Sequence, residues 1–267
     1  MNSSAEIARL YVDLGSQKTK LPLGKLFVMA ILAGAFIALG GLASTVASFG
    51  IQSAAAARII SGLVFPIGLS LVLVGGAELF TGNSLMIMPV LQKRAKVGGM
   101  LKNWLVVYLG NFVGSLAIAF AVAFFISGGK NGLYGGALSS SLIATANAKT
   151  SLGFGTAFVR GILCNFMVCM AVWISMAATH DLAGKIIAIY LPIFLFVLCG
   201  FEHCVANMYF IPVGFISMVQ AGTSIANLPW AGFLLGNMLP VTLGNLVGGA
   251  CCAGALYWYV YLQGNRE

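Results

Sequence analysis

The apolar residues of this chain fall in long continuous runs and do not alternate with polar ones. Runs at about residues 26–49, 101–126, 155–178 and 230–262 each have the roughly 20 residues that one membrane-spanning helix requires. A membrane β-barrel would instead show short segments of alternating character. The pattern therefore predicts an all-α integral membrane protein.

Two further apolar regions, at 58–92 and 185–220, are too long for one straight crossing. As unbroken helices they would measure about 52 and 54 Å, against a hydrocarbon core of about 30 Å. Both regions contain proline and glycine, which interrupt helices. We expect six transmembrane helices, of which the second and the fifth are broken inside the membrane.

The two overlong regions carry the same motif, because Gly76–Asn83 and Gly200–Asn207 both read G-x-E-x-x-x-x-N. The segment LGNFVG at 109–114 likewise recurs as LGNLVG at 243–248, an offset of 245 − 111 = 134 residues. Each half would cross the membrane three times, so the second half must insert upside down. We predict an inverted repeat of residues 26–127 and 152–262 within one transmembrane domain. A linker rich in Gly, Ser and Ala, at 128–151, would join the halves.

The N-terminal residues predict a short amphipathic helix at about 4–15, since Ile7, Leu10, Tyr11 and Leu14 share one helical face and Gly15 would end it. No removable signal peptide is expected. Lys and Arg residues are distributed unevenly between the predicted loops. Ten lie on the side of the termini and four (Arg58, Lys130, Lys149 and Arg160) on the other. The positive-inside rule then places both termini in the cytoplasm, for a multi-pass protein of the cell (inner) membrane.

Composition supports a membrane protein and excludes other classes. The chain is 60% hydrophobic and 7% charged, too few polar residues to cover a soluble fold. Its net charge of +8 includes a basic cluster at 93–102 that lacks nucleic-acid-binding motifs, so we expect no nucleic-acid partner. The six cysteines show no C-x-x-C spacing, and no metal site, disulfide or cofactor is expected.

Candidate chemistry is concentrated at the two breaks. Broken helices leave backbone groups unpaired at membrane depth, which is tolerated only where they line a cavity or are buried in protein. If the second half-helices begin near Asn83 and Ala206, their positive dipole ends point at the midplane and favour a small anion, with Thr81 and His203 adding polar groups. Asn207 closes the second motif at the same place.

Each of these residues also has a purely structural interpretation. His203 could be a hydrogen-bonded core histidine, although its place at a duplicated break favours function. Glu78 and Glu202 could brace the breaks by accepting backbone N–H bonds. Lys149 could be a solvated loop charge or could attract anions at a pore mouth. Asn111, Asn165 and Asn245 could be interhelical hydrogen-bond partners.

Three segments resemble the formate/nitrite transporter family: AELFTGN at 77–83, CNFMVCMAVW at 164–173 and GFEHCVANM at 200–208. The resemblance implies an aquaporin-like protomer with its own pore, assembled as a homopentamer in the lipid bilayer. It implies that Thr81 and His203 form a central pair, with Asn165 near His203 and Lys149 at the outer vestibule. It further implies a cytoplasmic constriction and an outer one, made respectively by Leu69, Leu79 and Phe80, and by Phe65 and Phe196.

The substrate expected from this resemblance is a small inorganic or one-carbon anion of a weak acid, carried with a proton. The aromatic pair Phe65 and Phe196 favours formate, while nitrite and hydrosulfide stay open. An aquaporin-like channel for neutral solutes shares the architecture, but the chain contains no Asn-Pro-Ala motif. A membrane enzyme would need a nucleophile with its base or a histidine pair, whereas only His203 lies within a predicted span.

Overall fold

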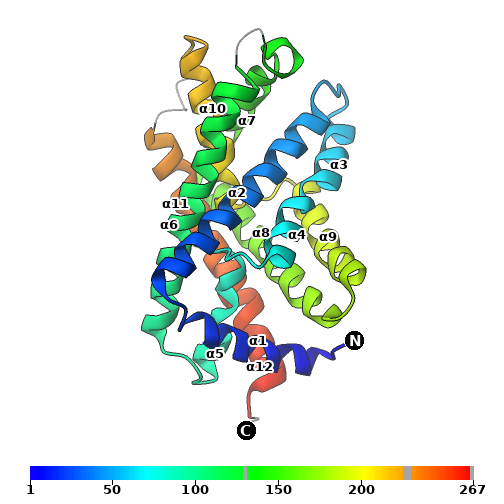
Figure 1. The fold of residues 1–267 in the computed structure, drawn as a ribbon, viewed down its shortest axis with the longest axis vertical. Coiled ribbons are helices and arrows are strands. Elements are labelled where there is room, and N and C mark those ends of the chain that lie inside the picture. The colour runs from blue at the N-terminus through cyan, green and yellow to red at the C-terminus, as the bar shows by residue number, and fades with distance from the viewer. Residues whose placement is uncertain (129–130, 225–229, 265–267) are drawn as a thin grey trace.

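Helices run along the long axis of the molecule and cross one another near its middle (Figure 1). The computed structural model describes residues 1–128, 131–224 and 230–264, and this part of the chain contains no strand. The elements of the first half are α1 (Ser4–Lys18), α2 (Leu23–Ser48), α3 (Ala54–Val64), α4 (Pro66–Gly75), the 3-10 helix η1 (Gly82–Met86), α5 (Ile87–Leu91), α6 (Val97–Ala121) and the π-helical turn η2 (Val122–Ile126).

The second half repeats this order with longer pieces after its interruption. Its elements are the 3-10 turn η3 (Leu133–Gly136), α7 (Leu138–Thr150), α8 (Phe154–Ser175), the 3-10 turn η4 (Met176–Ala178), α9 (Leu182–Leu198), α10 (Cys204–Gln220), the π-helical η5 (Gly232–Met238), α11 (Leu239–Leu246), the π-helical η6 (Val247–Ala255) and α12 (Leu256–Leu262).

Five helices in the described residues are long and apolar enough to cross a membrane, at 23–48, 54–75, 97–126, 154–178 and 232–262. The fifth crossing, which was expected to be broken, is divided between the shorter apolar helices α9 and α10. Neither overlong region is a straight helix. Gly76 and Gly200 follow α4 and α9 with φ of 75° and 67°, the left-handed conformation that ends helices and that glycine adopts without a side-chain clash.

Glycines bring the helices of each half into backbone contact. A Cβ atom at Gly114 of α6 would fall on the carbonyl oxygen of Ile31 in α2, and one at Gly248 would fall on that of Ile162 in α8. Such close approach is how membrane helices gain packing energy, since lipid and side chains are equally apolar. The two glycines occupy the same position in the LGN(F/L)VG repeat.

Residues 128–151 were expected to form a linker, and this prediction is wrong for most of the segment. Leu138–Thr150 form α7, which packs on α10. Leu138, Leu142 and Ala146 are fully buried, and a Cβ atom at Gly214 of α10 would meet the backbone of α7. The small residues that suggested a flexible connection are the surface through which two helices touch.

Helix α1 continues past Gly15 to Lys18, three residues beyond its expected end. Ser3 caps it, with Glu6 completing a capping box. A Cβ atom at Gly15 would lie 2.9 Å from the ring of Pro89, so this glycine allows α1 to lie on α5 and does not end the helix. Through Ile7 and Tyr11, both buried, α1 belongs to the protein core.

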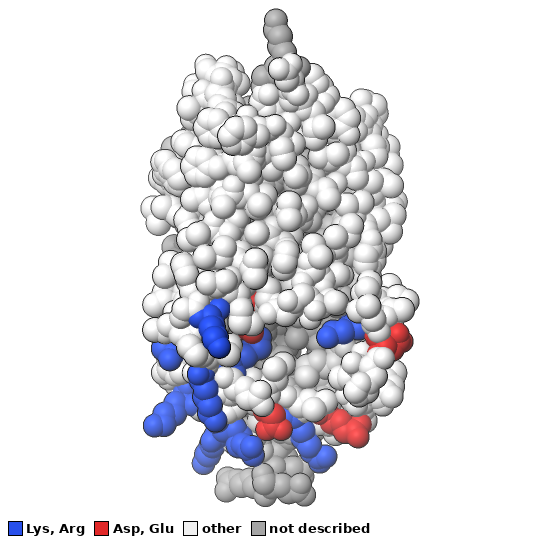
Figure 2. All heavy atoms as spheres, viewed as in Figure 1, with Lys and Arg blue, Asp and Glu red and all other residues white. Residues whose placement is uncertain are grey.

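Lys and Arg side chains collect at the end of the molecule that carries α1 and α12 (Figures 1 and 2). Most of the remaining face in Figure 2 shows no charged side chain. Large apolar residues are exposed along the described surface, among them Val28, Leu105, Phe125, Leu191 and Val260. An apolar band of this kind suits lipid or neighbouring subunits. Lys130 and Arg266, which entered the charge count, lie outside the described residues.

Candidate functional site

The two interruptions meet at Thr81 and His203. Thr81 Oγ1 lies 2.9 Å from His203 Nε2, and both residues are buried. Thr81 immediately precedes η1 and His203 immediately precedes α10, so two helix N-termini point at the same place. The expected contact between these side chains is therefore present. The half-helices begin at Gly82 and Cys204, slightly before the expected Asn83 and Ala206.

The hydrogen bonds of His203 assign its tautomer. Its Nδ1 accepts the backbone N–H of Ala206 at 3.1 Å, which caps α10. Because an accepting nitrogen carries no proton, the proton of the neutral ring sits on Nε2 and is donated to Thr81 Oγ1. A second proton on Nδ1 would face the N–H of Ala206 and remove the cap. The ring also stacks on Phe196, with centroids 6.1 Å apart.

A buried network holds the first interruption. Lys18 Nζ pairs with Glu78 Oε1 at 2.9 Å and donates to Asn83 Oδ1 at 2.8 Å. Asn83 Nδ2 donates to Glu78 Oε2 at 2.7 Å and to Asn103 Oδ1 at 2.9 Å. Glu78 was expected to accept backbone N–H bonds. It instead binds the side chains of Asn83 and of Lys18, the last residue of α1.

The second interruption has the same network. Lys149 Nζ pairs with Glu202 Oε1 at 3.0 Å, and Asn207 Nδ2 donates to Glu202 Oε2 at 2.7 Å and to Asn237 Oδ1 at 2.7 Å. Asn237 Nδ2 returns to the carbonyl of Lys149 at 2.9 Å. The side chain of Lys149 is only 17% exposed, so its interpretation as a solvated loop charge is wrong. Helix α7 therefore corresponds to α1 in the repeat.

Two asparagines bind the unpaired backbone of the interruptions. Asn111 Oδ1 accepts the N–H of Phe80 at 2.9 Å, and its Nδ2 donates to the carbonyl of Glu78 at 2.9 Å. Asn245 Oδ1 accepts the N–H of Cys204, also at 2.9 Å. Backbone groups at membrane depth have no water to bind, so these amides stabilise the broken conformation. Both asparagines were expected to bind neighbouring segments, and the segments they bind here are the interruptions.

Asn165 was expected near His203, and the structure places its amide on the other member of the central pair. Its Nδ2 donates to the carbonyl of Thr81 at 3.2 Å, to Ser84 Oγ at 3.1 Å and to the carbonyl of Asn245 at 2.6 Å. No hydrogen bond joins it to His203 among the described residues. Asn165 therefore positions the loop that carries Thr81.

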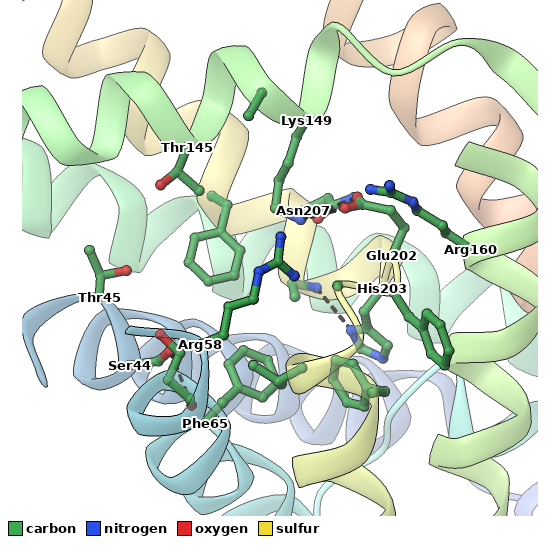
Figure 3. A pocket seen from close by; sticks show the side chains of 18 of the residues that line it. Ser44, Thr45, Arg58, Phe65, Thr145, Lys149, Arg160, Glu202, His203 and Asn207 are labelled. Carbon is green, nitrogen blue, oxygen red and sulfur yellow. Dashed lines mark hydrogen bonds and ion pairs between the residues drawn. The ribbon is translucent and has the colours of Figure 1, made fainter. Parts of the chain in front are cut away.

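Two cavities approach the central pair from opposite ends. One, of about 380 Å³, is called the α7 cavity because Lys149 of α7 lines it; Phe65, Phe196, His203 and Asn207 also line it (Figure 3). The other, of about 320 Å³, is the α1 cavity. Its lining includes Lys18, Glu78, Asn83, Leu69 and Leu79.

A central void of about 10 Å³ lies between the two cavities. It shares Phe65, Phe196 and His203 with the α7 cavity, and Leu69 and Leu79 with the α1 cavity. The rest of its lining is apolar: Ile37, Val168 and Ile193. The three spaces therefore lie in series, and His203 lines the smallest of them.

Four of the five expected constriction residues line the central void. Phe65 and Phe196 meet edge to face, with ring centroids 5.6 Å apart. Leu69 and Leu79 are buried on the opposite side of the void. Phe80 differs, because its ring packs edge to face on Tyr108 and is not among the residues that line the three spaces. The place of Phe80 in the cytoplasmic constriction therefore stays a prediction.

Both cavities carry more cationic than anionic side chains. Arg58, Lys149 and Arg160 line the α7 cavity with Glu202 as its one acidic residue. Lys18 and Lys185 line the α1 cavity, again with one carboxylate. The described residues contain no cluster of His, Cys, Asp and Glu that could hold a metal ion. Excess positive charge at both mouths concentrates small anions at the ends of the route.

Sequence reasoning missed Lys18, Asn103 and Asn237. The repeat contained the signal, since Lys18 precedes Lys149 by 149 − 18 = 131 residues and Phe27-Val28 precedes Phe158-Val159 by the same interval. Asn103 and Asn237 share the offset of 134 residues found for the LGN segments. Extending the duplication outward from its strongest match would have identified all three.

Comparison with known proteins agrees with this geometry. The formate/nitrite transporter family model matches residues 5–259. A probable formate transporter of Methanothermobacter thermautotrophicus is 40% identical over 98% of this chain and 97% of its own length. The formate channel FocA of Escherichia coli K12 is 36% identical over 98% of this chain and 95% of its own.

Two solved structures share the fold. One is described as a pentameric formate channel with formate bound; it superposes with a TM-score of 0.76 at 34% identity and covers 90% of this chain and 98% of its own. The other, an FNT family ion channel, gives a TM-score of 0.83 at 27% identity, with 95% and 98% coverage.

Proposed function

This chain belongs to the formate/nitrite transporter family, and we propose that it is a channel for formate, carried through the membrane together with a proton. The observation that carries the proposal is the position of His203. Its Nε2–H is a single hydrogen-bond donor at the narrowest point of an otherwise apolar passage, between two cavities with excess positive charge.

The cavities and the central void make opposite demands on a small anion. Lys149 and the arginines of the α7 cavity attract negative charge, as do the helix N-termini at Thr81 and His203. The central void offers a charge almost no solvation, at a cost of several kcal/mol or more. A weak acid meets both demands, because its anion collects in the cavity and its neutral form crosses the apolar void.

We infer that His203 supplies a hydrogen bond during this passage. A substrate oxygen takes the place of Thr81 Oγ1 as the acceptor of Nε2–H, so the imidazole stays neutral and the cap on α10 stays intact. The proton that neutralises formate comes from hydronium that reaches the cavity. Formate transport should then be faster when acid is added on the side from which formate enters.

Formate is favoured over nitrite and hydrosulfide by the relatives. The Methanothermobacter and Escherichia coli proteins are named for formate, and one solved neighbour is described with formate bound. The same neighbour is described as pentameric, and we propose a homopentamer in which every protomer has its own pore. The basic end with α1 and α12 faces the cytoplasm by the positive-inside rule, so the α7 cavity opens outward in the cell membrane.

Purified protein in liposomes tests this function. We expect uptake of formate under an inward proton gradient to exceed uptake of nitrite and hydrosulfide. His203→Phe should abolish most of this flux, because phenylalanine has similar bulk and no donor; His203→Asn should retain part of it. His180→Phe is the matched control, since His180 is exposed and lines neither cavity. Full flux through His203→Phe would contradict the proposal.

A further inference from the structure

Arg58 and Arg160 line the α7 cavity without an anionic partner. Among the described residues neither guanidinium makes a hydrogen bond or ion pair, and the one carboxylate of the cavity is taken by Lys149. Arg58 is exposed and Arg160 is half-buried. Two unpaired guanidinium groups in one cavity leave their planar sets of N–H donors available to a ligand.

Both arginines are tied to the second interruption. The N–H of Glu202 donates to the carbonyl of Arg160 at 3.3 Å, which anchors this turn of α8 to the loop. Arg58 reaches over from α3, and a Cβ atom at Gly200 would collide with its Nη1. A side chain at this position would displace the guanidinium from its present place. Figure 3 shows the two groups extending into the pocket from different elements, above the loop that carries His203.

The repeat shows that these charges belong to one side only. Met29 takes the place of Arg160 in the first half: its carbonyl accepts the N–H of Glu78 at 3.2 Å, and it lines the α1 cavity. At the offset 200 − 76 = 124 that relates the two glycines, Arg58 corresponds to Leu182. An apolar residue therefore stands at each equivalent position.

The reverse asymmetry exists at one position of the α1 cavity. Lys185 lines it, and at the same offset of 124 residues Lys185 corresponds to Ser61, which lines the α7 cavity. Each cavity thus contains an equivalent network, around Glu78 or Glu202, whereas the additional cations differ between the two cavities. The α7 cavity has two forked guanidinium groups and the α1 cavity has one flexible ammonium.

We propose that Arg58 and Arg160 form a binding site for a small planar oxyanion, a carboxylate or nitrite, at the mouth of the α7 cavity. The site captures substrate from that side before it reaches His203. A guanidinium binds two coplanar oxygens through parallel N–H donors, and a lysine ammonium does not. An anion with a single heavy atom, such as hydrosulfide, gains only the attraction between charges. This inference rests on the proposed function, because formate flux is its readout.

Sided membrane vesicles test the site. Initial uptake of radiolabelled formate is measured in right-side-out and inside-out vesicles carrying wild type, the double variant Arg58→Gln/Arg160→Met, or Lys185→Ser. We expect the double variant to raise the half-saturating formate concentration about three- to tenfold for uptake from the side of the α7 cavity, because two exposed ion contacts with the substrate are lost. For uptake from the opposite side the value should stay within about twofold of wild type. Lys185→Ser should act from the opposite side. Because each variant is its own control from its unaffected side, misfolding cannot imitate this result.

A second variant distinguishes the bidentate geometry of the guanidinium groups from their charge. Arg58→Lys/Arg160→Lys keeps both charges, so half-saturation for formate should still rise while that for hydrosulfide stays at the wild-type value. The arginine site is overturned if Arg58→Lys/Arg160→Lys has the wild-type half-saturation for formate, or if Arg58→Gln/Arg160→Met changes uptake equally from both sides. Either result leaves the proposed formate channel intact. A wild type that carries no formate overturns the channel and this site together.

Discussion

Removing one partner of the Lys149–Glu202 pair should destabilise the protein strongly. The two side chains are 17% and 6% exposed, and Lys149 Nζ reaches both carboxylate oxygens, at 3.0 and 3.2 Å. Lys149→Met leaves Glu202 charged and buried, with its carboxylate still bound by the amide of Asn207. Loss of one member of a buried pair typically costs about 3–5 kcal/mol.

The double variant Lys149→Met/Glu202→Gln should recover most of that loss. It removes both charges together, and the new amide still binds Asn207. For a chain of this size 3–5 kcal/mol corresponds to a fall in Tm of about 6–20 °C. The assay is thermal unfolding in detergent, followed by tryptophan fluorescence and by the elution volume of the surviving oligomer.

The first repeat provides a matched pair of variants. Lys18→Met should destabilise as Lys149→Met does, and Glu78→Gln should rescue it, because Lys18 and Glu78 are 2.9 Å apart in an equally buried setting. The reasoning would be refuted if Lys149→Met had the Tm of wild type, or if the Tm of the double variant were as low as that of the single variant. In either case the pair would not brace the interruption.

Two further predictions concern the interruptions themselves. Gly200→Ala and Gly76→Ala should each lower the free energy of unfolding by about 1–2 kcal/mol, because alanine is strained in the left-handed conformation. Only Gly200→Ala should also weaken formate uptake from the side of the α7 cavity, because its Cβ displaces Arg58. Asn245→Leu should lower Tm and abolish flux in liposomes, since each buried backbone group left unpaired costs about 1–3 kcal/mol. Asn147→Leu, a half-buried site whose side-chain oxygen has no partner among the described residues, should do neither. A functional Asn245→Leu channel would contradict the role given to that amide.

Hydrophobic pattern and repetition predicted the helical class and the two interruptions, and the family resemblance implied the pairing of Thr81 with His203. They succeeded because breaking a helix in a membrane requires compensation, and the residues that compensate are polar and stand out in an apolar run. Glu78 and Glu202 were found for this reason. Their partners were not, because a lysine near a helix end is ordinary and its long side chain can reach a buried carboxylate from outside the apolar run.

Helix α7 shows a different limit of pattern reading. Its sequence, LSSSLIATANAKT, has low hydrophobicity and no broad apolar face, so it resembles a linker. It packs through small residues whose backbones touch, at Ala146 against Gly214, and this kind of contact leaves little trace in hydropathy. Lys149 was therefore assigned to a loop, whereas it lies in the last turn of a helix that corresponds to α1.

The inverted repeat also explains why the narrowest point has only one strong polar group. At the offset of 124 residues, His203 corresponds to Leu79 and Thr81 to Val205. His203 and Leu79 both line the central void, so the two halves present an imidazole and an alkyl side chain at equivalent positions. Two leucines would offer a substrate no hydrogen bond, and two imidazoles would bind each other or water inside the constriction. One donor facing an apolar wall suits a molecule that needs a single hydrogen bond while it is uncharged, which is the condition of a protonated weak acid and not of its anion.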